Sequence, residues 1–370
     1  MARRLMLIAV MLTALTGCVF ALRHAVAAAR GSSSPPPVVQ IAGDDPVPPA
    51  LRTALQQAVR DGGAGVTAIV MRDGHLLYRL DVGAIDPHAQ YPVASASKWM
   101  TAALVMTVVD EGKLALDAPI SRYLPEFTGE AGTVTLRELL AQTSGEGSLR
   151  DAVDIRQDPR ITLAESAAQV ARRPLADPPG AVFKYGGPGF QVAGALVERV
   201  TGQRWADLFE ARIAAPLGMT HTYWMHLPAH GVTPAQTLNP LLQGGAVSTA
   251  VDYMRFLTML AQGGTYDGHR ILSAQAVEAM ETAQTLGKPM AYEPRGAAAV
   301  DHAQYALGNW CETWMDAGRC TLVSSPGAFG TFPWIDRRSG VYGIFFTRTR
   351  LPRVIDDLVA ARHAILAAVH

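Results

Sequence analysis

The chain has 370 residues, of which 49% are hydrophobic and 17% charged, and its 32 basic and 32 acidic side chains give no net charge. This length allows a large core, in one domain or in two lobes. The sequence has no basic block and no basic stripe with interleaved aromatic residues, which argues against nucleic acid as a partner. It also lacks a repeat of solenoid or propeller period.

The N-terminus has the features of an export signal. Arg3 and Arg4 precede an apolar run over 5–15, and small residues follow. The tetrapeptide Leu-Thr-Gly-Cys that ends at Cys18 resembles a bacterial lipobox, in which the cysteine is lipidated. We therefore expect residues 1–30 to be a lipoprotein signal and tether, with lipidation of Cys18.

Two other fates of the N-terminus remain open. One is cleavage after the Ala-Val-Ala stretch at 25–27, and the other is an uncleaved anchor, because an apolar run of about 18 residues marginally spans a membrane. In each case the positive-inside rule places the rest of the chain in the periplasm or the outer cell envelope. The membrane is thus an expected partner through the lipid or anchor. Residues 31–50, rich in Ser and Pro, have the composition of a linker.

Regular elements are predicted from residue 51 onward. A short amphipathic helix is expected over 51–60, followed by strands over 65–71 and 75–82 that are joined by Asp73-Gly74, a strong hairpin signal. The segment 97–112 is apolar on almost all sides, which predicts a helix in the core.

A long helical and loop-rich stretch follows, and strand signals then return. The expected helices are 136–141, 163–172, 191–200, 205–214, 251–262 and 274–281; the expected strands are 304–312, 320–325, 331–335 and 341–347; a helix over about 352–368 closes the chain.

This order predicts an α+β fold of two lobes over 51–368. An antiparallel sheet flanked by helices is expected from both chain ends, about 51–100 and 300–368, and a mostly helical lobe, about 101–299, is inserted between them. A cleft between such lobes is a usual place for a small-molecule site.

Besides Cys18, the chain has the two cysteines Cys311 and Cys320. The alternating segment 310–314, the turn-like 316–318 and the strand that follows predict a hairpin that brings the two together. In an exported protein a disulfide is expected, the alternative being two free thiols. The sequence has no Cys-x-x-Cys or His-Glu-x-x-His spacing, so we predict no metal and no other cofactor.

Ser95 and Lys98 are the first candidates for chemistry. In a helix they would stand on one face, three residues apart. The apolar helix behind them would bury Lys98, where an ammonium is costly unless it is paired or loses its proton. A lysine with a lowered pKa beside a serine hydroxyl activates that serine as a nucleophile. The other interpretation is a helix N-cap serine followed by a lysine that reaches solvent.

Tyr185 is the candidate that would complete the proton path of such a serine. It lies in the glycine-rich segment 178–189, directly before the expected helix at 191–200. A tyrosine in such a turn can approach a neighbouring helix end closely. The alternative is an ordinary core or surface tyrosine.

Four segments in this order resemble the superfamily of serine β-lactamases and D-alanyl-D-alanine peptidases, the penicillin-binding-protein-like enzymes, and within it the class C-like branch with related esterases. The resemblance covers 51–368. Its segments are 93–98 around the Ser-x-x-Lys motif, 136–145, where Gln142 replaces the histidine of His-Thr-Ser-Gly, 183–190 around Tyr185, and 244–252.

The resemblance implies roles for these residues. Ser95 would be the acylated nucleophile, and Lys98 and Tyr185 would share the acid/base work. If Tyr185 acts as a phenolate, a nearby ammonium has to lower its pKa from about 10. The backbone N–H groups of Ser95 and Ala328 would form the oxyanion hole. Gly327, which has no side chain, would let the substrate lie against its strand.

Two of the implied substrate-binding positions depart from the family pattern. Gly187 stands where the family has an asparagine that binds the substrate amide, and glycine has neither its donor nor its acceptor. Ser325 stands where a lysine or histidine is expected, so a cation for a substrate carboxylate is missing, and Pro326 lacks an N–H. Both departures weaken the case for penicillin or peptidoglycan recognition.

The sequence therefore predicts an exported serine hydrolase that forms an acyl-enzyme on Ser95 with a small-molecule acyl substrate. An ester is favoured, because an alkoxide leaves more easily than an amine. Two alternatives remain open: a β-lactamase or D,D-carboxypeptidase that acts on penicillins or peptidoglycan stem peptides, and a non-catalytic binding lipoprotein of the cell envelope on the same fold. An α/β-hydrolase is disfavoured, because no Gly-x-Ser-x-Gly motif is present.

Overall fold

The computed structural model describes residues 35–62, 65–86, 88–148, 158–294 and 296–369. The expected export signal and Cys18 lie outside the described residues. Among the described residues, no helix has both the length and the apolar character that a membrane crossing requires.

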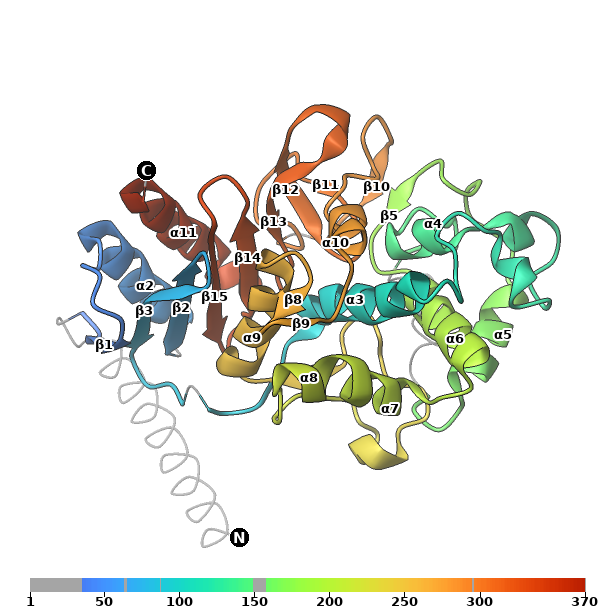
Figure 1. Cartoon of the computed structure of the whole chain (residues 1–370), viewed down its shortest axis with the longest axis horizontal. Helices are drawn as coiled ribbons and strands as arrows, with labels where there is room; N and C mark the ends of the chain where they lie inside the picture. Colours follow the sequence, from blue (N-terminus) through green and yellow to red (C-terminus); the bar gives the residue numbers. More distant parts are fainter. Residues whose placement is uncertain (1–34, 63–64, 87, 149–157, 295, 370) are drawn as a thin grey trace, which may run out of the picture. The chain divides into compact units, whose positions relative to one another are not determined.

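The central sheet is antiparallel and is built from both ends of the chain, as the sequence predicted (Figure 1). Its strand order is β1-β3-β2-β15-β14-β13-β12-β11. The strands are β1 (Val38–Ala42), β2 (Val66–Arg72), β3 (His75–Val82), β11 (Gln304–Tyr305), β12 (Trp310–Trp314), β13 (Cys320–Ser324), β14 (Phe332–Asp336) and β15 (Val341–Thr347).

The hairpin of β2 and β3 forms at the predicted turn. Asp73 and Gly74 both have positive φ, 49° and 86°. A two-residue turn of this kind matches the twist of the two strands that it joins. Tyr78, Leu80 and Val82 alternate as buried residues along β3 and pack into the core on one face of the sheet.

Two segments differ from the expectation. Strand β1 pairs with β3 and lies inside the segment whose composition indicated a linker, so Val38–Ala42 belongs to the sheet. The single strand expected over 304–312 is divided into β11 and β12 by a turn at Gly308, which has a φ of 80°. A Cβ on Gly308 would lie 2.5 Å from the carbonyl oxygen of Lys98, so the close passage of α3 (Ser97–Asp110) requires glycine there.

Helices cover both faces of the sheet. α2 (Pro49–Gly62) and α11 (Ile355–Val369) lie side by side on one face of the sheet. Each buries one of its own faces in the same core cluster as the strands. α9 (Ala250–Ala261) packs against β15 from the other side, where the larger core also includes α3 (Figure 1). α3 is buried from Ser97 to Val108, as predicted for a helix without a polar face.

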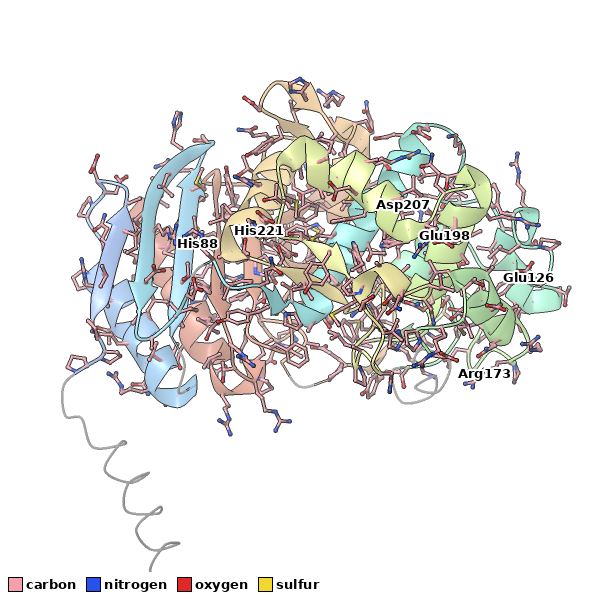
Figure 2. All side chains as sticks on the ribbon, turned by 90° about the horizontal axis from the view of Figure 1, so that it is seen from below. His88, Glu126, Arg173, Glu198, Asp207 and His221 are labelled. Atoms are coloured by element: carbon pink, nitrogen blue, oxygen red, sulfur yellow. A yellow bond between two sulfur atoms is a disulfide. The ribbon has the colours of Figure 1, made fainter. Side chains whose placement is uncertain are left out.

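The inserted helices between residues 136 and 217 form a second group. They are α4 (Leu136–Leu140), α5 (Leu163–Ala171), α6 (Gly189–Thr201), α7 (Trp205–Phe209) and α8 (Ala215–Leu217). The helix expected over 205–214 ends at Phe209 and continues as a π-helical turn over Glu210–Ala214. α10 (Ala274–Met280) packs against α3. Glu198 of α6 accepts a hydrogen bond of 2.7 Å from the backbone N–H of Trp205, which fixes the start of α7 against α6. Figure 2 shows Glu198 and Asp207 near each other on these two helices, with Glu126 and Arg173 on turns farther from the sheet.

Three small sheets connect the loops around this group. They are β4 (Tyr91–Pro92) with β7 (Ala246–Ser248) and β6 (Tyr223–Trp224), β5 (Phe183–Lys184) with β10 (Met290–Tyr292), and β8 (Thr265–Tyr266) with β9 (His269–Arg270).

Two cross-links hold the β12 end of the sheet. Cys311 and Cys320 form the predicted disulfide between β12 and β13. Glu312 forms a bidentate ion pair with Arg362 of α11, with N–O distances of 2.7 and 2.5 Å, and both side chains are 0% exposed. The guanidinium also lies 5.2 Å from the ring centroid of Phe332. This pair therefore joins α11 to the sheet through a fully desolvated contact.

Candidate active site

Ser95 lies in a short 3₁₀ turn, η1 (Ala94–Ala96), directly before α3. Ala94 has a φ of 47°, a left-handed conformation that costs a non-glycine residue about 1 kcal/mol. The hydroxyl of Tyr253 donates a 2.7 Å hydrogen bond to the carbonyl oxygen of Ala96, which anchors the turn from α9. Ser95, whose side chain is partly exposed, therefore directly follows a strained residue in a turn that α9 anchors.

Lys98 is buried beneath this serine. Its side chain is 2% exposed, and its Nζ donates a 3.1 Å hydrogen bond to Ser95 Oγ and a 2.8 Å bond to the carbonyl oxygen of Gln243. The same Nζ lies 4.6 Å from the ring centroid of Tyr185, within the range of a cation–π contact. The structure thus brings the three predicted catalytic residues together, and the interpretation of Lys98 as a lysine that reaches solvent is wrong.

A buried glutamine fixes the loop that carries the Gln243 carbonyl. Gln191 of α6 accepts a 2.8 Å hydrogen bond from the N–H of Leu242 and donates to Pro240 O (2.9 Å) and Asn239 Oδ1 (2.6 Å). Because this loop is held against α6, the oxygen that receives Lys98 has a defined place.

Tyr185 sits in the turn between β5 and α6, walled by aromatic rings. Its ring is nearly parallel to that of Trp310, with 5.6 Å between centroids and 11° between planes, and lies edge-on to Tyr305 at 5.9 Å. Burial raises the pKa of Tyr185 above its ordinary value; the interaction of its hydroxyl with Ser95 opposes that rise, and the charge of Glu293 adds to it. This direction favours a phenol over a phenolate at Tyr185, because the aromatic wall removes water from the hydroxyl and this effect dominates.

The end of β13 lies against the turn that carries Ser95. A Cβ on Gly327 would lie 2.0 Å from the carbonyl oxygen of Val93, so only glycine allows this approach. The Ser325 hydroxyl is buried and directed at the backbone, 3.4 Å from Ser95 O and 3.5 Å from Gly308 O. The exposed Ala328 follows Gly327 directly, and the oxyanion role of its N–H stays a prediction.

Gly187 is closely packed at the position where the resemblance implied a substrate contact. A Cβ there would lie 2.4 Å from the carbonyl oxygen of Gly147. Such a distance is far below contact, so no side chain fits at position 187 while the loop around Gly147 keeps its place.

The same loop carries a buried carboxyl group. Glu146 Oε2 accepts a 3.0 Å hydrogen bond from Ser144 Oγ, and its buried Oε1 has no hydrogen-bond partner among the described residues. Burial raises the pKa of Glu146 to about 7, against the smaller opposing effect of the Ser144 bond.

Sequence reasoning missed three contributors to this site. Trp310 was noted only as a strand residue, although it forms the wall beside Tyr185. Gln243 contributes a backbone carbonyl, which leaves no signal in residue type. Gln142 was visible as a departure from the family motif, but its contact with Gly186 was not predicted.

Comparison with known families agrees with this architecture. A model of the Beta-lactamase family matches residues 51–368, which is most of the chain. The solved structure of a putative beta-lactamase from Bacteroides dorei superposes with a TM-score of 0.72 and 31% identity, over 82% of this chain and 93% of that chain.

Two curated relatives match shorter stretches. Esterase EstB of Burkholderia gladioli is 36% identical over 197 residues, which is 46% of this chain and 49% of EstB. Penicillin-binding protein 4 of Amycolatopsis lactamdurans is 30% identical over 250 residues, which is 59% of this chain and 64% of that protein. The chain thus spans about half the length of the esterase and somewhat less than two thirds of the penicillin-binding protein.

Proposed function

Because the chain belongs to the beta-lactamase family, we propose that it is a serine hydrolase that forms an acyl-enzyme on Ser95. The observation that carries this proposal is the 3.1 Å hydrogen bond between Lys98 Nζ and Ser95 Oγ inside a buried, aromatic-walled site. A base within hydrogen-bond reach of a serine hydroxyl is the arrangement that nucleophilic catalysis requires.

Each residue has a task in the proposed reaction. Ser95 Oγ attacks the acyl carbon, and its proton passes to Lys98 Nζ, which must be uncharged to accept it. The N–H groups of Ser95 and Ala328 stabilise the tetrahedral oxyanion. Tyr185, kept as a phenol by its raised pKa, gives a proton to the leaving oxygen and regains one from Lys98. The bond to the leaving group breaks, and an alcohol departs.

The second half of the reaction restores the enzyme. A water molecule attacks the acyl carbon, and its proton returns through the same two side chains to Ser95 Oγ as the acyl–Oγ bond breaks. The products are a carboxylic acid and free Ser95, so the net reaction is hydrolysis of the substrate.

We propose esters as the substrate class. Gly187 offers no side-chain amide to a substrate, and the carbonyl of Gly147 fills the space that a side chain there would need. Ser325 is neutral and hydrogen-bonded to the backbone, so this position supplies no cation for a substrate carboxylate. The similarity to esterase EstB supports the same class.

A serine-directed fluorophosphonate probe, applied to the detergent-extracted full chain, tests the proposal. We expect one label per chain, located at Ser95 by mass spectrometry and absent in Ser95→Ala. Ser121→Ala, which changes an exposed serine, is the matched control and should label like the wild type. A folded wild-type protein that takes no label would contradict the proposal and favour the non-catalytic binding lipoprotein.

A substrate panel separates the ester proposal from the β-lactamase or D,D-carboxypeptidase alternative. Esters of graded acyl length are compared with nitrocefin and a D-alanyl-D-alanine peptide. Turnover of nitrocefin or the peptide above that of every ester would favour the alternative.

The intact mass of the same extract tests the proposed lipidation of Cys18.

A further inference from the structure

Gln142 follows α4 directly and occupies an unusual backbone conformation. Its φ is 58°, and it is 7% exposed. A glutamine gains nothing from a left-handed conformation by itself, so the contacts of its side chain and backbone have to stabilise it there.

These contacts bracket Tyr185. The carbonyl oxygen of Gln142 accepts a 3.1 Å hydrogen bond from the N–H of Lys184, and its Oε1 accepts a 2.5 Å bond from the N–H of Gly186. The two residues that flank Tyr185 in the chain are therefore tied to one glutamine. The N–H of Tyr185 itself donates 2.8 Å to the carbonyl oxygen of Tyr292.

The other end of the same amide is buried near the aromatic wall. Gln142 Nε2 has no hydrogen-bond partner among the described residues. Its nearness to the hydroxyl of Tyr305 partly opposes the rise in the Tyr305 pKa caused by burial. Tyr305 lies edge-on to Tyr185 and at 4.9 Å from Trp310. One side chain thus bonds the backbone beside the proposed proton donor and lies next to its aromatic wall.

The turn after Tyr185 begins with two residues that restrict the backbone little by themselves. Gly186, with a φ of 84°, and Gly187 follow it, and two successive glycines leave the backbone free to adopt many conformations. A displacement of about 1 Å of a catalytic group is enough to reduce a rate by up to about 100-fold.

We propose that Gln142 is a positioning residue that holds the Tyr185 hydroxyl at the leaving group of the substrate. This inference rests on the proposed function. It predicts a defect specific to proton donation, because the Ser95–Lys98 contact does not involve Gln142.

The test compares two esters of the same acid, one with a 4-nitrophenol leaving group, which departs without a proton, and one with an alkyl alcohol, which needs a proton. Gln142→Asn and Gln142→Gly both suit a left-handed φ, and neither reaches the Gly186 N–H. We expect each to lower kcat for the alkyl ester by about 10- to 100-fold, with little change in KM and less than about a 3-fold effect on the nitrophenyl ester.

Rescue and a double variant distinguish positioning from a general structural role. Gln142→Glu keeps an acceptor for Gly186 and should retain most of the alkyl-ester rate. Tyr185→Phe should show the same leaving-group dependence more strongly, and adding Gln142→Asn to it should cause no further loss. Gln203→Met, at an exposed glutamine after α6, is the control and should behave like the wild type.

Equal losses on both esters, or a further loss in the Tyr185→Phe background, would overturn the inference. Either result is distinct from a failure of the proposed function, in which the wild-type chain is not labelled at Ser95 at all.

Discussion

Lys98 and Gln243 are 145 positions apart in the sequence, and the Nζ of the first donates a 2.8 Å hydrogen bond to the carbonyl oxygen of the second. This bond directs one proton of the amine away from Ser95 and leaves the rest of the group facing the serine hydroxyl. The loop that Gln191 holds therefore sets the orientation of the proposed base.

Lys98→Met should keep the buried volume and remove the base. We expect kcat/KM for a 4-nitrophenyl ester to fall by about 10²- to 10⁴-fold, with thermal stability close to that of the wild type. Lys113→Met, at a side chain that is 48% exposed, is the matched control for loss of an ammonium. A Lys98→Met variant that keeps wild-type kcat/KM would exclude this lysine as the base.

Gly187→Ala should damage the site although it adds a single methyl group. The new Cβ would overlap the Gly147 carbonyl at 2.4 Å, so one of the two loops has to move, at a cost of about 1–3 kcal/mol. We expect a lower melting temperature and at least a 10-fold loss of ester hydrolysis. Gly187→Asn restores the residue of the family motif. Because its Cβ would meet the same carbonyl, this variant should not hydrolyse nitrocefin.

Gly244→Ala is the comparison for Gly187→Ala. The nearest atom to its new Cβ lies at 3.5 Å, an ordinary contact, so its melting temperature should stay close to that of the wild type. If Gly187→Ala were as stable as Gly244→Ala, the loop at Gly147 would have to be more adaptable than we infer.

Glu146→Gln should change how stability depends on pH. The pKa of Glu146 is raised from 4.5 to about 7 in the folded state. The contribution of this carboxyl group to the free energy of unfolding is therefore fully present below about pH 4.5 and is lost as the pH rises through about 7. The loss amounts to at most about 3 kcal/mol, from 1.36 kcal/mol per unit. Melting temperatures are measured at pH 4.5 and at pH 8. The melting temperature of Glu146→Gln, relative to that of the wild type, should be higher at pH 8 than at pH 4.5. Glu126→Gln, at an exposed carboxylate, is the control, and equal pH dependence of all three proteins would refute the prediction (Figure 2).

Arg362→Met should destabilise the protein strongly, because it leaves the carboxylate of Glu312 buried without its partner. We expect a loss of about 3–5 kcal/mol, measured as a shift in the urea midpoint, and recovery of most of it when Glu312→Leu is added. Arg137→Met breaks the exposed pair with Asp117 and should cost less than about 1 kcal/mol. A single and a double variant of equal stability would show that the desolvated charge is not the cause.

Local signals were sufficient for much of the fold. The Asp73-Gly74 turn and the apolar segment behind Ser95 each follow from a few neighbouring residues, and both appear where they were predicted. β1 was missed because the serines and prolines before it dominate the composition, whereas its order comes from pairing with β3.

The site was predictable in its residues and less so in its electrostatics. Ser95, Lys98 and Tyr185 belong to motifs, but the direction of the Tyr185 pKa depends on rings of Phe183, Tyr305 and Trp310 that only the tertiary structure assembles. The contact between Gly187 and Gly147 involves no side chain at all, so residue type carried no trace of it.

The pairing of β2 with β15 has a consequence for how the chain acquires its structure. Val66 lies opposite Thr347, so the middle of the sheet joins a strand made early in synthesis to one made almost at the end. Closing so long a loop is slow compared with the formation of local hairpins and helices. Until β15 has emerged, the edge of β2 that pairs with it lacks its partner strand, and a nascent chain interrupted before β15 would leave that edge open to aggregation.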